Sequence, residues 1–411
     1  MWKDRFKRLR DALTRLSETF SKVGKDPRFK WYQRGMWAFS AVWAVVVVAQ
    51  SVSYYTYIGD GKAAQQRGQY AQAQELFEAA LNDVKHSFSF AMIGKRDGRY
   101  ANALNNLAEL QRVTGHYQDS ESNYIEVRAR AAQRPGNKSE AYAVSTNNLA
   151  ALYRDLAKYD ESERLYKEAI DIWENALKKT TDTKYAASLN GLAKLYRDEG
   201  KYQQAETLYK KSLDIRLRSL GRDNQDVAEV VGNLGGLYRD EHRYKESEQL
   251  YLQALDIDRR VLGDTHPYVA TDMNNIAGLY RDMQRYDEAD KLFNKALMLR
   301  QKILGPDHPY CAKSWLGIAE NTRLSKGSDS KCEKALQCAL AIDEKALGKD
   351  HPDYATACDT AFNYYFAAGD YDKAQNYNDE ALRIRKKVLG STHPDLRKSL
   401  HNRELLLNAK R

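Results

Sequence analysis

The sequence predicts an all-α fold, a superhelical solenoid of about eight stacked helix pairs that follows a single transmembrane helix. Two observations predict this architecture. The tetrapeptide Leu-Tyr-Arg-Asp occurs four times, at intervals of 42 or 43 residues, in a chain of 411 residues. Ahead of these repeats, residues 36–58 contain no charged side chain. Repeats of this period are typical of helical solenoids, and about 20 consecutive, mainly apolar residues are long enough to cross a bilayer.

Each repeat predicts a hairpin of two helices, named here helix A and helix B. Helix A carries the tetrapeptide, whose copies are Leu152–Asp155, Leu195–Asp198, Leu237–Asp240 and Leu279–Asp282. Helix B begins near a tyrosine, and three residues later a small residue lets the two helices approach closely: Ser162, Ala205, Ser247 and Ala289. Later copies end with Leu-Gly and then His-Pro. This order indicates a boundary between two helices, because Gly terminates a helix and Pro fits the start of the next one. One pair cannot bury both of its faces, so the pairs stack.

Weaker copies flank the four clear ones. The tripeptide Gly-x-Tyr at residues 68–70, 115–117 and 369–371 marks three of them. In a fourth, damaged copy, a polar loop at residues 325–330 replaces the tight turn. The repeats therefore predict a solenoid over residues 60–394 and a polar capping helix over residues 395–411.

These repeats resemble the tetratricopeptide repeat in its longer form, similar to the repeats of kinesin light chains. The resemblance covers about residues 60–395. It implies a right-handed superhelix in which the A helices line a concave groove. The heptad region that joins a light chain to its heavy chain is missing from this sequence, so a motor role is not expected.

Residues 1–35 form a basic head, with eleven Lys and Arg residues against four acidic residues. Its apolar residues, from Trp2 to Val23, recur at alternating spacings of four and three. This pattern predicts an amphipathic helix suited to an anionic membrane surface. A coiled-coil seam between two copies fits the same spacing, and a mitochondrial presequence is a third alternative, disfavoured by the acidic residues.

Residues 36–58 predict the transmembrane helix, with tryptophans toward one end and tyrosines toward the other, where interfacial rings are expected. A cleaved secretory signal is the alternative, but a charged head of 35 residues is too long for an ordinary signal. Because the basic excess precedes the span, we expect a cytoplasmic N-terminus and repeats outside the cytoplasm. The location would be a bacterial inner membrane with periplasmic repeats or, alternatively, the mitochondrial inner membrane.

The sequence contains no pattern typical of catalysis, metal binding or nucleic-acid binding. After residue 35 the basic and acidic residues nearly balance, so the footprint that phosphate backbones require is missing. Four histidines occupy the same loop of successive repeats, too far apart to share a metal: His266, His308, His351 and His393. We therefore expect no enzymatic activity, no cofactor and no metal. Cys332 and Cys358 align with buried helix positions, whereas the oxidation of Cys311 and Cys338 is left open.

Two ladders of polar residues on helix A are the candidate functional site. The first consists of Asn105, Asn147, Asn190 and Asn274, and the second of Arg112, Arg154, Arg197, Arg239, Arg281 and Arg323. In a repeat that carries both, Asn and Arg lie seven residues, or two turns, apart and so share a face. The resemblance places this face in the groove, where Asn would bind the backbone of an extended peptide and Arg its carboxylates. Alternatively, each Arg pairs with an Asp of a neighbouring repeat and staples the stack, and the two roles are compatible.

These features predict a membrane-anchored scaffold or adaptor that binds acidic or extended segments of partner proteins. The alternative is a permanent structural or assembly subunit of a large membrane protein complex, in which the convex surface and the head are buried. Both functions belong to proteins that work by contact.

Overall fold

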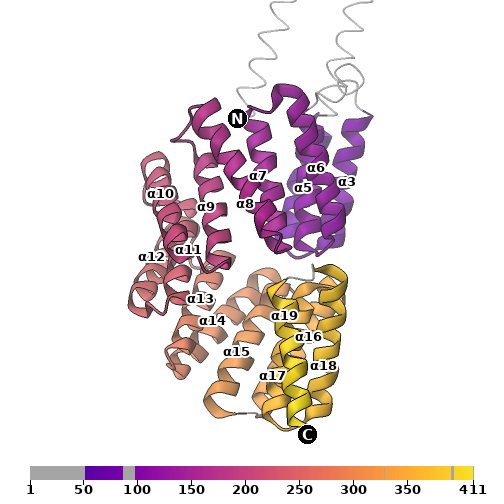
Figure 1. Ribbon diagram of the computed structural model, residues 1–411, viewed down its shortest axis with the longest axis vertical. Coiled ribbons are helices and arrows are strands. Elements are labelled where there is room, and N and C mark those ends of the chain that lie inside the picture. Colours follow the sequence, from indigo (N-terminus) through magenta and orange to yellow (C-terminus); the bar gives the residue numbers. More distant parts are fainter. Residues whose placement is uncertain (1–50, 87–97, 328, 390–392, 411) are drawn as a thin grey trace, which may run out of the picture.

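The computed structural model describes residues 51–86, 98–327, 329–389 and 393–410, and the secondary structure of these residues is entirely helical (Figure 1). The A helices are residues 51–66, α5 (Gly98–Val113), α7 (Glu140–Asp155), α9 (Thr183–Asp198), α11 (Gln225–Asp240), α13 (Pro267–Asp282), α15 (Pro309–Lys326) and α17 (Pro352–Ala367). The B helices are α3 (Tyr70–Lys85), α6 (Tyr117–Ala131), α8 (Tyr159–Asp171), α10 (Tyr202–Leu220), α12 (Tyr244–Leu262), α14 (Tyr286–Leu304), α16 (Ser330–Leu347) and α18 (Tyr371–Val388). Short π-helical turns, η2 (Ala132–Gly136) and η3 (Ile172–Ala176), extend α6 and α8. The terminal helix α19 (Pro394–Ala409) takes the place of the expected cap.

A capping side chain fixes the start of most A helices. Ser139, Asp182 and Asn224 accept a hydrogen bond from a backbone N–H in the first turn of α7, α9 and α11. Before α13, α15, α17 and α19 a histidine does so through Nδ1, at 3.0–3.3 Å: His266, His308, His351 and His393. The proline after each histidine stands at a position whose N–H would have no partner in the helix. The predicted loop histidines are therefore helix caps.

Small residues hold the two helices of a pair in close contact. The hydroxyls of Ser120, Ser162 and Ser247, near the start of three B helices, donate at 2.8 Å to the A-helix carbonyls of Ala108, Ala150 and Gly235. The Cys332 thiol makes the corresponding contact with Ala319 O at 3.2 Å. All four donors are at most 1% exposed. A larger residue there would force the helices apart.

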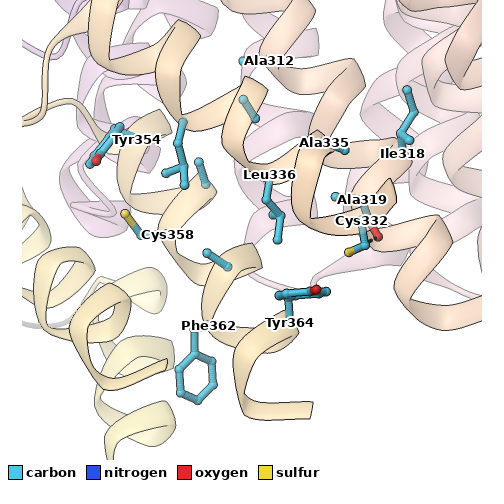
Figure 2. Packing of buried hydrophobic residues seen from close by; sticks show 14 of the residues in the cluster. Ala312, Ile318, Ala319, Cys332, Ala335, Leu336, Tyr354, Cys358, Phe362 and Tyr364 are labelled. Carbon is cyan, nitrogen blue, oxygen red and sulfur yellow. Dashed lines mark hydrogen bonds between the residues drawn. The ribbon is translucent and has the colours of Figure 1, made fainter. Parts of the chain in front are cut away.

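The C-terminal repeats share one continuous core, which Figure 2 shows around Leu336, Phe362 and Tyr364. As the sequence predicts, Cys332 and Cys358 are buried in this core as small hydrophobic residues. Cys311 is also buried, Cys338 is half-buried, and all four thiols are free in the structure.

The first A helix begins earlier than predicted. Tyr54 and Ile58, assigned from the sequence to the end of the membrane helix, are buried in the core of the first repeat. The helix continues through Gly59 and Gly61 to residue 66. Gly61 is a packing residue, because a Cβ there would lie 2.5 Å from the Phe77 ring. The solenoid therefore includes residues 51–58, and the domain boundary at residue 60 was placed too late.

The rest of the predicted transmembrane helix, residues 36–50, lies outside the described residues, as does the basic head. Within the described ranges, no helix combines the length and the apolar character that crossing a membrane requires.

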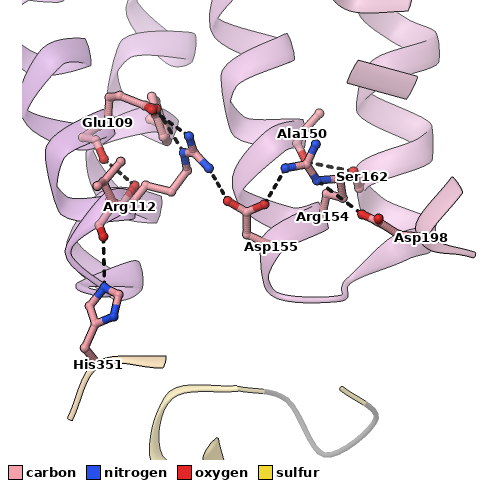
Figure 3. Close-up of polar contacts among 12 residues, drawn as sticks. Glu109, Arg112, Ala150, Arg154, Asp155, Ser162, Asp198 and His351 are labelled. Carbon is pink, nitrogen blue, oxygen red and sulfur yellow. Dashed lines mark hydrogen bonds and ion pairs between the residues drawn. The ribbon is translucent and has the colours of Figure 1, made fainter. Parts of the chain in front are cut away.

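The superhelix contacts itself after six repeats. Figure 1 shows the C-terminal helices directly below the N-terminal ones. His351, at the start of the eighth repeat, places Nε2 3.0 Å from the carbonyl oxygen of Val113, at the end of helix A in the second repeat (Figure 3). His393 makes the equivalent contact with Asp155 O in the third repeat, at 3.4 Å. Because Nδ1 of each histidine accepts a bond from its own helix, Nε2 carries the proton and donates it across this inter-turn contact.

Glycine makes room for the inter-turn contact in the first two repeats. Gly68 and Gly115 have φ values of +70° and +75°, which favour glycine. A Cβ at these positions would also lie 2.7 Å from the His308 ring and 3.1 Å from the His351 ring. Two independent constraints therefore select glycine in the turns that face the histidines.

We predict that acid removes the stability that His351 contributes, because protonation of Nδ1 abolishes the helix cap, although Nε2 still donates to Val113. Burial lowers the pKa of His351, an effect that Asp353 and the hydrogen bond to Val113 oppose and that Lys313 and His116 reinforce. The unfolded chain takes up this proton below about pH 6.5 whereas the folded chain does not, so stability contributed by His351 is lost as the pH falls below that value. The variant His351→Asn retains a capping side chain but not the reach to Val113. It should lower the free energy of unfolding by about 1 kcal/mol near neutral pH, and by less in acid.

Urea unfolding of the two proteins between about pH 7.5 and pH 4.5 measures this difference. Buried Asp272 and Asp343, whose pKa values burial raises to about 8 and about 7, shift stability in the opposite sense but equally in both proteins. His266→Asn is the matched control, because this histidine caps its helix with no inter-turn hydrogen bond among the described residues. Equal effects of the two substitutions at every pH would contradict the inter-turn role.

Candidate functional site

The predicted arginine ladder forms ion pairs between neighbouring repeats. In four cases the partner is the aspartate that ends the next A helix: Arg112 with Asp155, Arg154 with Asp198 at 3.6 Å, Arg197 with Asp240 at 2.6 Å and Arg239 with Asp282 at 2.6 Å. Arg154 also reaches Asp155 on its own helix, at 2.7 Å, so that Arg112, Asp155, Arg154 and Asp198 form one chain of alternating charge (Figure 3). The geometry is that of staples between repeats.

The last two ladder residues depart from this scheme. Arg281 turns to Asp282 on its own helix, at 3.4 Å. Arg323 pairs with Glu320 within α15, at 2.7 Å. Leu324 replaces the aspartate of the tetrapeptide in the damaged copy, so no staple of this type joins the sixth and seventh repeats.

Glycines on the A helices receive these guanidinium groups. A Cβ at Gly236 would lie 2.6 Å from Arg197 Nη1, and one at Gly278 would lie 2.9 Å from Arg239 Nη1. The arginines therefore pack flat against the next helix. Burial lowers the pKa of Arg197, but the hydrogen bond to Asp240, the charge of that carboxylate and two nearby tyrosines together raise it above its ordinary value.

The asparagine ladder also bonds within the solenoid. Asn105 accepts from Asn148 at 2.7 Å, Asn190 accepts from Asn233 at 3.1 Å, and Asn274 accepts from Ser314 at 3.2 Å. Each of these bonds joins the A helices of adjacent repeats. Asn147 is different, because its Oδ1 is buried and has no hydrogen-bond partner among the described residues.

The two ladders thus lie on one face of the A helices, as predicted, with much of their hydrogen-bonding capacity used internally. The five ladder arginines from Arg112 to Arg281 keep 19–29% of their side chains exposed. Their aspartate partners are 22–46% exposed. The arginines and aspartates on this A-helix face form a strip of half-exposed, charge-balanced groups, whereas Asn190 is buried.

Sequence reasoning missed a row of buried charges on the B helices. One charged residue recurs at the same position in five successive helices and is 2–5% exposed: Arg216, Asp258, Arg300, Asp343 and Arg385. Their spacing of 42 or 43 residues, in phase with the repeat, was the signal that could have revealed them. Buried charges at fixed positions need partners, and so they point to places where the solenoid or a ligand must supply one.

Burial raises the pKa values of the acidic members of this row. Burial raises the pKa of Asp258 to about 6 and that of Asp272, which faces it, to about 8, with the Asp258 charge adding to the second effect. One oxygen of each has no partner among the described residues. Across the same described ranges, no group of three or more His, Cys, Asp or Glu side chains is arranged to hold a metal ion.

A family model of the tetratricopeptide repeat matches residues 99–175, 184–240, 226–297 and 270–329, more than half of the chain, and a second such model matches residues 363–395. The chain belongs to the tetratricopeptide-repeat family. Proteins of this family generally mediate protein–protein interactions. A comparison with curated proteins finds no match.

Solved structures show similar folds at low identity. BtubC (BKLC) from P. vanneervenii is 23% identical, with a TM-score of 0.46 over 59% of this chain and 92% of that one. The apo form of RapI is 16% identical, with a TM-score of 0.46 over 82% and 98% of the two chains. A putative kinesin light chain from Podosopora anserina is 22% identical, with a TM-score of 0.40 over 49% and 94%. These likenesses concern the fold alone.

We predict that the Arg197–Asp240 pair stabilises the stack. Replacing either residue by Ala should lower the free energy of unfolding, and replacing both should lower it by less than the sum of the two effects. The coupling should be about 0.5–1 kcal/mol, because 29% and 37% of the two side chains are exposed to screening solvent. Urea unfolding at low and high salt measures it, and the coupling should shrink with salt. A coupling of zero at low salt would contradict the staple.

Proposed function

We propose that the chain is a membrane-anchored adaptor whose A-helix face binds extended or acidic segments of partner proteins. The observation that carries the proposal is the strip of half-exposed polar groups, which repeats with the same chemistry from one A helix to the next. An extended segment has a repeating backbone of donors and acceptors, so a surface with a matching repeat suits it.

The charge balance of the strip limits what each contact contributes. Because the ladder arginines already face aspartates, an acidic residue laid along the strip gains little at any one of them. Affinity would then come from several repeats acting together, and it should fall as salt is added.

The membrane anchor in this proposal rests on the sequence. Since the solenoid includes residues 51–58, the anchor would consist of the uncharged residues 36–50 together with the basic residues 1–35. The basic excess ahead of the anchor favours a cytoplasmic N-terminus and repeats outside the cytoplasm.

A permanent subunit of a membrane complex is the second candidate. Exposed apolar side chains on the B helices favour it, chiefly Met298, which is 70% exposed, and Leu252, which is 45% exposed. Such residues are typical of surfaces that a partner covers. The two functions therefore use opposite faces of the solenoid.

Photo-crosslinking in intact cells distinguishes the two functions. A photoreactive residue is placed at position 232, which aligns with the ladder asparagines and where a Cβ would make an ordinary contact with Ala254, at 3.8 Å. The matched position on the B helices is Met298. The adaptor should yield crosslinks from position 232 that sediment with membranes and are lost when cells are first exposed to high salt. Salt-resistant crosslinks from position 298 alone would contradict the adaptor and favour the permanent subunit, and crosslinks that remain in the soluble fraction would contradict the anchor.

A further inference from the structure

Three B helices carry a buried arginine in the same setting. Arg216 in α10, Arg300 in α14 and Arg385 in α18 are 4%, 3% and 2% exposed. Each donates through Nη1 to a backbone carbonyl ten residues later, at the start of the next A helix, at distances of 2.5, 2.8 and 3.1 Å. The three sites are therefore internal copies of one another and can be compared residue by residue.

Two of the three arginines have a carboxylate partner within the solenoid. Arg216 pairs with Glu229 at 3.1 Å, thirteen residues further along the chain. Although burial raises the pKa of Glu229, Lys194 and Arg216 lower it to about 2. Arg385 binds both oxygens of Asp359, each at 2.9 Å. Such a partner offsets the large cost of burying a charge.

Arg300 has no carboxylate partner among the described residues. Lys313 stands at the position that corresponds to Glu229, and Asn274 stands at the position that corresponds to Asp359. Both replacements remove a negative charge, and the first adds a positive one. The Arg300 copy of the site therefore lacks the counter-ion that the Arg216 and Arg385 copies contain.

Neutral groups surround the Arg300 guanidinium instead. Tyr310 O and Ser314 Oγ accept from Nη1, both at 2.8 Å, and Thr271 Oγ1 accepts from Nη2 at 3.2 Å. Nε is buried without a partner among the described residues. Burial lowers the pKa of Arg300 to about 10, because no carboxylate offsets the cost of burying its charge.

Exposed donors lie next to this buried charge. The Tyr310 ring is centred 5.5 Å from the Arg300 guanidinium and 5.8 Å from Lys313 Nζ. Tyr310 is 42% exposed, and the Lys313 side chain is 49% exposed. Lys313 pairs with Asp353 at 3.3 Å, and this carboxylate does not reach Arg300. Asp343 also lies near Lys313, but burial raises its pKa to about 7 and so weakens its charge.

We propose that this cluster, Arg300 with Lys313, Tyr310 and Asn274, is an anchor site for a carboxylate of an acidic partner segment. The inference rests on the proposed function and names the part of the A-helix face at which an acidic residue binds most strongly. Lys313 Nζ and Tyr310 Oη are the accessible donors. Arg300 is buried beside them, and its charge attracts the bound carboxylate through the poorly solvated interior. The ladder arginines differ from Arg300 because aspartates already neutralise them.

The substitution Asn274→Asp tests the anchor without changing side-chain volume. It places a carboxylate where Asp359 pairs with Arg385, and so supplies Arg300 with an internal counter-ion. The full-length protein in detergent is titrated with a fluorescein-labelled octaglutamate peptide, and with octaglutamine as the uncharged probe, while anisotropy is recorded. Asn274→Asp should bind octaglutamate at least tenfold more weakly than the wild type and should also melt at a higher temperature.

Gln253→Glu is the control, because it adds the same charge with no change of side-chain shape at an exposed position of α12, a B helix outside the two ladders. It should leave octaglutamate binding within about twofold of the wild type. Equal weakening by both substitutions, or no weakening by Asn274→Asp, would overturn the anchor while leaving an acidic-segment adaptor intact. If the wild type binds octaglutamine as tightly as octaglutamate, both the anchor and the acidic preference in the proposed function are overturned, whereas crosslinks from position 232 still test the binding face.

Discussion

The close approach of the two helices within each pair is the contact on which the rest of the structure depends. Serine, alanine or cysteine near the start of each B helix is buried against the A helix, and where a hydroxyl is present it bonds to an A-helix carbonyl, as Ser162 does to Ala150. This contact fixes the position of one helix on the other, so each pair presents the same faces to its neighbours. Stacking identical units then brings equivalent residues into line across repeats. The arginine staples, the amide contacts and the row of buried charges all follow from that alignment.

The same regularity brings distant parts of the chain together. A constant rotation from pair to pair returns the superhelix to its starting direction after six repeats, where His351 and His393 reach carbonyls of the second and third repeats. The histidines then have two functions, since one ring nitrogen caps a helix and the other joins two turns of the superhelix. Breaks in the regularity are equally informative. At Arg300 the repeat keeps the buried charge and loses its counter-ion, and at Leu324 it loses the aspartate of a staple.

Much of the fold could be predicted from the sequence, because the period, the small residues and the His-Pro starts are local signals. The staple role of Arg197 was one of two alternatives, since adjacency in sequence does not say which aspartate an arginine reaches. Residues 51–58 were misassigned because an apolar face packed in the core of the first repeat and an apolar face turned toward lipid have the same composition. The inter-turn histidines could not be predicted, because their contacts depend on the rotation between repeats and join residues more than 200 positions apart. The unpaired Arg300 could not be predicted either, because its distinguishing feature is a counter-ion that is missing.

Closure of the superhelix in this register is the central claim, since it gives the histidines, Gly68 and Gly115 a common explanation. The most direct test is a distance measured in solution between spin labels on the two sides of the inter-turn contact. Gln118 and Lys349 are exposed and flank it, and labels attached there through non-natural amino acids leave the four cysteines untouched. Pulsed dipolar spectroscopy should give a single narrow distribution at short distance. A broad distribution centred at long distance would show an open solenoid and contradict the account.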